Sequence, residues 1–362
     1  MQNVGGMYYN PYIYQPGYPQ MNSPYYPVCP PRTVIPQVPA PVQNSQDVKL
    51  EQQMNTQGQV NRSNLEANIP TISDCDGEIK DFKQGFAGDC WFLSGIKALS
   101  ATSSGKKYIK DSIVKNSDGS FTVNFKGVGK SYVISPKEFQ DARNMVEGDK
   151  GLDGTSGIFI HKYSTGDPDA LLLELAMKKY RTDLVNNKID LSSMPNYAGA
   201  FVCKNNPEDG GPAAQVFYML TGKQSGTIST TGLQIPDKNE TLCPANGEKL
   251  SEFLDKYISN NDDYAVGFNV KSDVTVKDIS GKDVFLSAKH MFAFEKADAN
   301  TITITNPKDT SNKITLSLDT FKNVVKTLEY VNLKDDNDPF DEELKKYSVK
   351  HTETENYINK NY

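Results

Sequence analysis

The 362-residue sequence has little of what marks several common classes of protein. Its five cysteines are too few and too scattered for a disulfide framework, and without a Cys-x-x-Cys pair they give no zinc or redox motif. No apolar run is long enough to span a bilayer. The 39 Lys and Arg residues form no basic stripe, so we expect no nucleic-acid partner. The N-terminus lacks the basic-then-apolar order of a secretory signal, which favours a cytoplasmic location.

The first 65 residues also lack the periodic apolar pattern of a folded domain. Residues 1–45 contain ten of the 20 prolines, seven tyrosines and one charged side chain, Arg32. Such a mixture cannot bury an apolar face, so we predict a disordered Pro/Tyr-rich arm that continues into a linker up to residue 65. The arm is either a plain flexible tail or a docking segment for a partner with an aromatic-lined groove.

The strongest chemical signal is residues 84–93, Gln-Gly-Phe-Ala-Gly-Asp-Cys-Trp-Phe-Leu. Two glycines and Asp89, a good N-cap residue, precede an apolar run, which predicts a loop that enters a helix at Cys90. A thiol at a helix N-terminus is shifted toward thiolate, the nucleophilic form. The amide of Gln84 is a candidate donor to the oxyanion of an attacked carbonyl. The alternative is that Cys90 is one more buried structural cysteine.

A nucleophilic cysteine needs a base, and the chain has three histidines. His351 lies in a charged C-terminal tail, where we expect it to be solvated. His161 lies in an apolar segment of the helix-rich half and is a weaker candidate. His290 lies in an alternating pattern from Val284 to Phe294, which predicts a strand. His290 is therefore the predicted base.

The following predicted strand contains a partner for this histidine. A hairpin centred on Asp298 sets His290 and Asn306 directly opposite each other on one face, within reach of a hydrogen bond. An asparagine in that position would orient the imidazole of a cysteine protease. The alternative is a satisfied strand histidine beside a turn asparagine.

The remaining patterns predict an α+β fold with helices concentrated before residue 225 and strands after it. Period-two alternation predicts a hairpin over residues 120–134. Apolar stripes and end signals predict three further helices and four β segments: helices over 169–180, 213–222 and 246–260, and strands over 264–270, 283–295, 301–305 and 313–318.

Residues 84–93 resemble the active-site segment of calpains, whose pattern is Gln-Gly-x-x-Gly-Asp-Cys-Trp-Phe-Leu, and every fixed position is present. Weaker similarities follow in the family's order: Ala170–Tyr180, Gly210-Gly211, Thr221-Gly222, Lys289-His290 and Asn306-Pro307. The resemblance covers roughly residues 66–335. It implies a papain-like core of two subdomains, a helical one with the cysteine (about 66–225) and a β-rich one with His290 and Asn306 (about 226–335), followed by a charged tail over 336–362.

The resemblance implies a calpain-like cysteine endopeptidase that acts on proteins or peptides through Cys90, His290 and Asn306, with Gln84 as an oxyanion donor. It also implies calcium as an activator. No EF-hand loop is present, but Asp81 falls at a position matching an acidic calcium ligand of the family.

Two positions depart from the family pattern. Lys289 stands where glycine is usual, and Lys308 replaces the tryptophan that would shield the asparagine–histidine hydrogen bond. Two alternatives therefore stay open. One is a weak or inactive scaffold that acts by binding proteins. The other is a transglutaminase-like acyl transferase. The third member of the triad argues against the transferase, because it is Asn306 rather than an aspartate.

Overall fold

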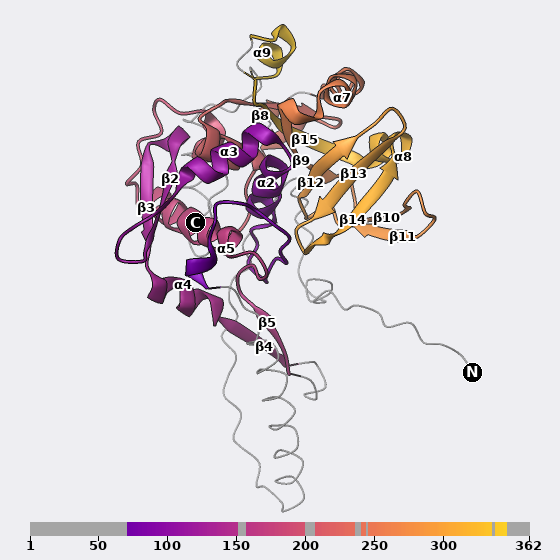
Figure 1. Cartoon of the computed structure of the whole chain (residues 1–362). Helices are drawn as coiled ribbons and strands as arrows, with labels where there is room; N and C mark the ends of the chain where they lie inside the picture. The colour runs from indigo at the N-terminus through magenta and orange to yellow at the C-terminus, as the bar shows by residue number, and fades with distance from the viewer. Residues whose placement is uncertain are drawn as a thin grey trace, which may run out of the picture.

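A computed structural model describes residues 71–150, 157–199, 207–235, 240–243, 245–334 and 337–345. The fold is α+β, with the helices of the first half packed beside a sheet formed by the second half (Figure 1). The predicted arm over 1–65 and His351 lie outside the described residues. Among the helices of the described ranges, none combines the length and the apolar composition of a membrane-spanning helix.

The helical half contains the predicted helices, with end signals that the sequence indicates. Helix α5 begins after Asp167, whose carboxylate accepts the Ala170 N–H at 3.0 Å, and Pro168 occupies its first turn. Helix α6 ends at Gly222, whose φ of 74° is the left-handed conformation of a glycine C-cap. The helices of this half are α2 (Cys90–Ser100), α3 (Ser103–Ser112), α4 (Pro136–Arg143), α5 (Pro168–Val185) and α6 (Ala213–Thr221).

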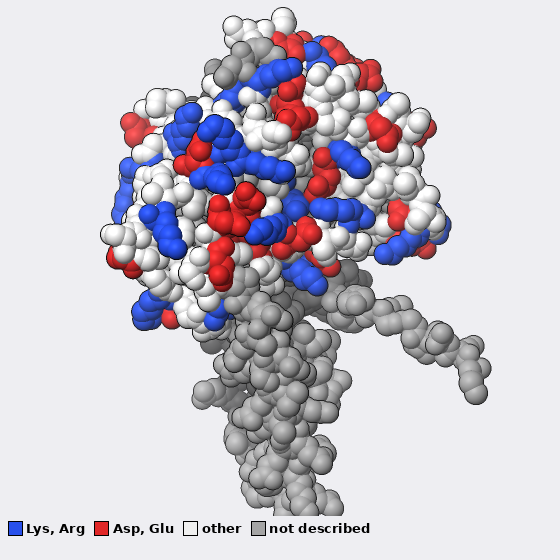
Figure 2. All heavy atoms as spheres, in the orientation of Figure 1, with Lys and Arg blue, Asp and Glu red and all other residues white. Residues whose placement is uncertain are grey.

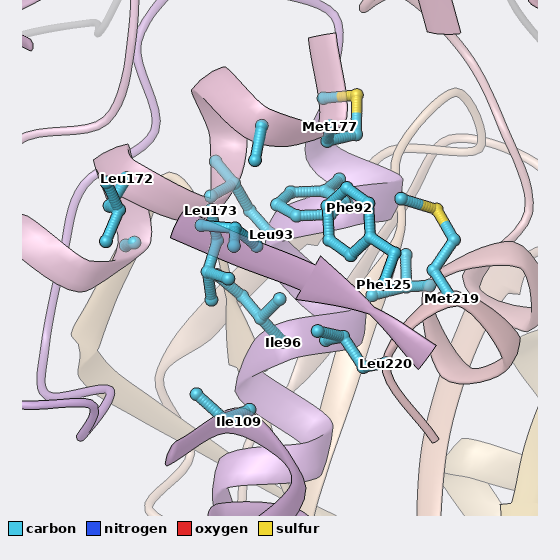
Figure 3. Close-up of a cluster of buried hydrophobic side chains, with 14 of the residues drawn as sticks. Phe92, Leu93, Ile96, Ile109, Phe125, Leu172, Leu173, Met177, Met219 and Leu220 are labelled. Carbon is cyan, nitrogen blue, oxygen red and sulfur yellow. The ribbon is translucent and has the colours of Figure 1, made fainter. Parts of the chain in front are cut away.

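Helix α2 is the centre of the first hydrophobic core. Phe92, Leu93 and Ile96 are fully buried, and they lie among side chains of α3, α5, α6 and β2 (Figure 3). Its other side packs against strands β9 and β12 of the large sheet. Because α2 is enclosed on both sides, its N-terminus, where Cys90 stands, is held in a fixed place.

The large sheet has six strands in the order β14-β13-β12-β9-β15-β6, and every adjacent pair is antiparallel. The whole of β9 is buried, since Ala265 faces the first core while Val266 and Phe268 face a second one. The sheet thus separates two cores. Its strands are β6 (Ser225–Ser229), β9 (Tyr264–Val270), β12 (Phe292–Ala297), β13 (Thr301–Asn306), β14 (Asp309–Ser317) and β15 (Val325–Asn332).

Aromatic side chains fill the second core. The ring of Phe268 lies 5.4 Å from those of Phe292 and Phe294 and 5.1 Å from that of Phe321, measured between centroids. Helices α7 (Lys249–Ser259) and α8 (Leu318–Val324) contribute to this core, and α7 confirms the helix predicted over 246–260.

Smaller elements complete the described chain. The predicted hairpin over 120–134 is confirmed as β2 (Phe121–Phe125) and β3 (Lys130–Ile134), with β1 (Ile113–Lys115) beside β2. Three more pairs are β4 (Val146–Lys150) with β5 (Gly157–His161), β7 (Leu233–Ile235) with β8 (Glu240–Cys243), and β10 (Val274–Lys277) with β11 (Asp283–Leu286). The 3-10 turns are η1 (Ile72–Asp74), η2 (Lys126–Val128), η3 (Asn196–Gly199) and η4 (Asn261–Asp263).

The predicted strand over 283–295 is wrong as a single element. It is divided into β11 and β12, and the segment between them leaves both sheets. The carboxylate of Asp273 accepts the Ala288 N–H at 2.8 Å and the Ser287 hydroxyl at 3.1 Å, which holds this segment as a turn. His290 follows this turn and so lies just before β12 rather than within a strand.

The tail predicted over 336–362 is charged as expected, but its described part is not a separate tail: it is a helix packed on the fold. Helix α9 (Pro339–Lys345) buries Phe340 and Leu344 in the second core. Asp341 is buried as well and accepts the Tyr330 hydroxyl at 2.8 Å. The folded region therefore extends at least to Lys345.

Candidate active site

The loop before Cys90 is held by three segments that lie far away in the sequence. Its backbone N–H groups donate to Pro307, to the His161–Lys162 segment and to Asp209, at distances of 2.8 to 3.1 Å. The approach is close enough that a Cβ on Gly85 would lie 2.4 Å from the His161 carbonyl oxygen. Glycine is required at this position, and the loop that leads into Cys90 is bonded both to the helical half and to Pro307 of the sheet half.

Cys90 is the first residue of α2, and the residue after His290 contacts it. The backbone N–H groups of Met291 and Trp91 donate to the Cys90 sulfur. One turn further along α2, the Ser94 hydroxyl donates to the Met291 carbonyl at 2.8 Å. The two contacts with Met291 bring the cysteine and the histidine segment together.

His290 is oriented by Asn306. Its Nε2 lies 2.7 Å from Asn306 Oδ1, and the Lys308 N–H donates to the same oxygen at 2.9 Å. Because that oxygen is an acceptor, Nε2 of the imidazole carries the hydrogen, and the lone pair of a neutral ring is then on Nδ1. The nitrogen left for chemistry is therefore Nδ1.

The predicted hydrogen bond between His290 and Asn306 is confirmed, but the strand geometry from which it was predicted is wrong. In that register Ala293 would oppose Thr303. Ala293 instead pairs with Thr305, and a bulge follows between Phe294 and Lys296. His290 reaches the end of β13 from the turn before β12, not as a cross-strand neighbour.

Burial decides the charges of both candidate reacting groups. It raises the pKa of the Cys90 thiol, and this outweighs the lowering by the Met291 and Trp91 N–H groups and by Lys308. Burial also lowers the pKa of His290 to about 4; Asn306 opposes this shift and the Lys308 cation adds to it. In this arrangement the thiol and the imidazole are both neutral at pH 7, so the helix N-terminus alone does not produce the expected thiolate.

Gln84 lies beside Cys90 but is already engaged. Its Nε2 donates to the Ala87 carbonyl at 2.8 Å and to the Asp89 carboxyl at 3.2 Å, which uses both amide hydrogens. The side chain must turn away from these acceptors before it can donate to an oxyanion. The Cys90 N–H, as the first of α2, is one of the donors that a helix leaves without an internal partner.

Asp81, the candidate calcium ligand, contacts ammonium groups. Its Oδ1 lies 3.1 Å from Lys97 Nζ of α2 and 3.7 Å from Lys313 Nζ of β14, and it accepts the Thr310 hydroxyl at 3.3 Å. Within the described ranges, no three His, Cys, Asp or Glu side chains are grouped so that they could hold a metal ion. Asp81 thus links the helical half to the sheet half through charge.

Two further features bear on the predicted residues. His161 Nδ1 lies 3.0 Å from the Arg143 carbonyl oxygen, a backbone contact typical of a structural histidine. Sequence reasoning missed Ser94, although its place four residues after Cys90 puts both on one helix face.

The face in Figure 2 shows Lys and Arg interspersed with Asp and Glu, in keeping with the scattered charge of the sequence.

Comparison with known proteins adds no assignment. No protein-family model matches the chain, and no curated protein matches it.

Proposed function

We propose that this chain is a cysteine endopeptidase with a papain-like, calpain-type core, in which Cys90 is the nucleophile, His290 the general base and acid, and Asn306 the residue that orients the imidazole. The observation that carries the proposal is the 2.7 Å contact between His290 Nε2 and Asn306 Oδ1 beside the N-terminus of α2. The segment resemblance around Cys90 supports it independently.

The first chemical step is a proton transfer coupled to attack. His290 Nδ1 takes the proton of the Cys90 thiol as the sulfur forms a bond to the peptide carbonyl carbon. Both groups start neutral, so the transfer creates the ion pair only when the substrate is bound. The developing oxyanion accepts the Cys90 N–H and, once it has rotated, the Gln84 amide, each worth a factor of about 10² to 10³ in rate.

The second half of the reaction regenerates the enzyme. The carbon–nitrogen bond breaks as the imidazolium gives its proton to the leaving amine, which leaves a thioester on Cys90. Water then attacks the thioester with His290 as base, the carboxylic acid product leaves, and the sulfur recovers its proton. Asn306 keeps the ring in one orientation through both halves.

The second candidate is a catalytically weak scaffold that acts by binding proteins. Two observations favour it: His290 has its pKa lowered to about 4, and the Gln84 amide hydrogens are already used. A chain that stayed in this arrangement would be a poor enzyme.

Calcium remains part of the proposal as an activator. A calcium ion at Asp81 would have to displace Lys97 Nζ from the carboxylate, which would alter a link between α2 and the sheet half. Asp81→Asn would then remove any calcium response of activity while leaving the calcium-free rate in place.

The test is peptide-bond hydrolysis of an unstructured protein substrate, with new N-termini counted by mass spectrometry in calcium and in chelator. We expect cleavage by the wild type, none by Cys90→Ala, and a loss of about 10² to 10⁴ in rate for His290→Ala. His161→Gln is the matched histidine control and should keep the wild-type rate. Absence of cleavage in both conditions favours the scaffold, and incorporation of an added amine without hydrolysis favours the acyl transferase.

A further inference from the structure

A pair of buried carboxyl groups lies directly behind Cys90. Asp89 precedes the cysteine and Glu174 lies in the middle of α5; both side chains are fully buried, and each carboxyl group shifts the pKa of the other. Asp89 occupies the N-cap position of α2, yet its side chain makes no cap hydrogen bond. It points into the interior instead.

The other contacts of the pair use one oxygen of each carboxyl group. Asp89 Oδ1 accepts the Gln84 amide at 3.2 Å. Glu174 Oε2 accepts the Ser164 N–H at 2.9 Å and the Ser164 hydroxyl at 2.7 Å. The remaining oxygens, Asp89 Oδ2 and Glu174 Oε1, are buried and receive no donor from the described part of the chain. A proton held between these two oxygens would satisfy both.

We propose that Asp89 and Glu174 share one proton. The resulting hydrogen bond fixes the Asp89 side chain, and through it the positions of Gln84 and of the first turn of α2, where Cys90 stands. This inference rests on the proposed cysteine chemistry for its consequence, although the shared proton stands on the contacts alone. Asp89 Oδ2 carries the hydrogen and Glu174 Oε1 accepts it, which leaves every oxygen of the pair satisfied. The pair then carries a single negative charge.

The number of protons follows from the surroundings. With no proton, two anions would face each other in a fully buried site, which is strongly unfavourable. With two protons, one hydroxyl would lack an acceptor. Charged and titratable groups face the pair from every neighbouring element: Cys90 of α2, Tyr163 before α5, Lys178 and Arg181 of α5, and Glu208 and Asp209 before α6. Lys162 pairs with Glu208 at 2.7 Å, which engages that carboxylate outside the pair.

Amide substitutions test the hydrogen-bond pattern, because an amide mimics a protonated carboxyl group. Its oxygen always accepts hydrogen bonds and its NH₂ group always donates them. Asp89→Asn keeps an acceptor for Gln84 and a donor for Glu174, and Glu174→Gln keeps acceptors for Ser164 and a donor for Asp89. In the double variant two NH₂ groups face each other, and rotation of either amide only moves the clash to Gln84 or Ser164. We expect each single variant to react with a thiol-directed peptide probe within about threefold of wild type, and the double variant to lose roughly tenfold or more.

Asp169→Asn is the matched control on the same helix. Asp169 is buried, and its two oxygens accept the Asp76 and Gly77 N–H groups at 3.0 and 3.1 Å. An amide there sets a donor against a donor, so this single change should lower the melting temperature, whereas Asp89→Asn should not. Two additive single effects at Asp89 and Glu174, with no excess loss in the double variant, would overturn the shared proton.

Two further readouts do not depend on any activity. Infrared spectra of the wild type at pH 7 should contain the carbonyl band of a buried protonated carboxyl group that is missing in Asp89→Asn. The Asp89 pKa is raised in the folded state by burial and then by Glu174, so the wild type loses stability through this group as the pH rises above the unfolded value of about 3.8. The Asp89→Asn protein lacks this contribution and keeps only the losses that come from the other buried carboxyl groups, Glu174 among them. The difference in melting temperature should therefore grow in favour of Asp89→Asn between pH 4 and 8. If probe labelling fails in every variant while the infrared band and the growing difference in melting temperature are found, the proposed function fails and the shared proton stands. If the infrared band is absent and the difference in melting temperature is constant, the shared proton fails.

Discussion

At the scale of single residues, the charge of His290 governs the expected pH dependence. The ring is buried beside Asn306 and near the Lys308 cation, and its pKa is lowered to about 4. A neutral imidazole is the form that accepts the thiol proton, so labelling of Cys90 should stay constant from pH 7 to 5 and fall by half only near pH 4. The measurement is a pH profile of the labelling rate with a peptide vinyl sulfone. A half-point near 6.5 would mean that His290 is solvated.

Lys308 affects both reacting groups. Its charge favours the thiolate form of Cys90 and disfavours the imidazolium form of His290. Its positive charge lowers the pKa of Cys90 and that of His290. Lys308→Gln should therefore move both limbs of the labelling profile to higher pH, the acid limb through His290 and the alkaline limb through Cys90. Lys289→Gln, the neighbouring cation, is the control. Movement of only one limb in Lys308→Gln would contradict an effect of this cation on both groups.

At the scale of elements, one hydroxyl joins α2 to the histidine segment. Ser94 is fully buried, and its hydroxyl donates to the Met291 carbonyl. Ser94→Ala leaves that carbonyl without its donor, so we expect a loss of about 1 to 3 kcal/mol in the free energy of unfolding together with slower labelling of Cys90. Urea denaturation and the probe reaction measure the two effects.

Ser100→Ala on the same helix is the comparison for Ser94→Ala. The Ser100 hydroxyl donates to the Lys97 carbonyl within α2 at 2.8 Å. Its removal should change stability without changing the labelling rate. Equal effects of the two variants on labelling would show that α2 and the histidine segment are not coupled through Ser94.

The local elements were predictable because their signals are local. Asp167 and Pro168 begin α5 and Gly222 ends α6 as the sequence indicates. The turn before His290 was not predictable, because an alternating pattern continues through residues 283–295 while the acceptor that forms the turn, Asp273, belongs to another part of the hairpin. The hydrogen bond to Asn306 was predicted from a register that differs by two residues from the observed one.

At the scale of the whole molecule, the sheet separates two cores and the C-terminal helix closes the second. Phe340 of α9 is buried there although it stands in a highly charged stretch. Phe340→Ala should lower the free energy of unfolding by about 3 to 5 kcal/mol, because it removes a large buried side chain and leaves a cavity. The measurement is denaturant unfolding. A change below 1 kcal/mol, the size of a surface substitution, would mean that α9 is not docked.

The protonation states and ion pairs around the site depend on the whole fold. They could not be predicted from the sequence for that reason. A thiol at a helix N-terminus predicts a thiolate, but enclosure by both halves of the molecule raises the pKa of Cys90 instead. Asp81 falls at an acidic ligand position, yet Lys97 from α2 and Lys313 from β14 converge on it. The packing of elements far apart in the chain decides which side chains come into contact. Signals from single residues do not predict those contacts.

The most direct test of the central claim is the rate at which a peptide vinyl sulfone labels each cysteine of the folded chain, located by mass spectrometry, in the wild type and in His290→Ala. We predict rapid labelling confined to Cys90 in the wild type and a loss of about 10² to 10⁴ in that rate without His290. Cys75, a free thiol whose pKa burial raises, is the internal reference and should stay unreactive in both proteins. Labelling of Cys90 no faster than Cys75, or unchanged by loss of His290, would contradict the assembled Cys-His-Asn site.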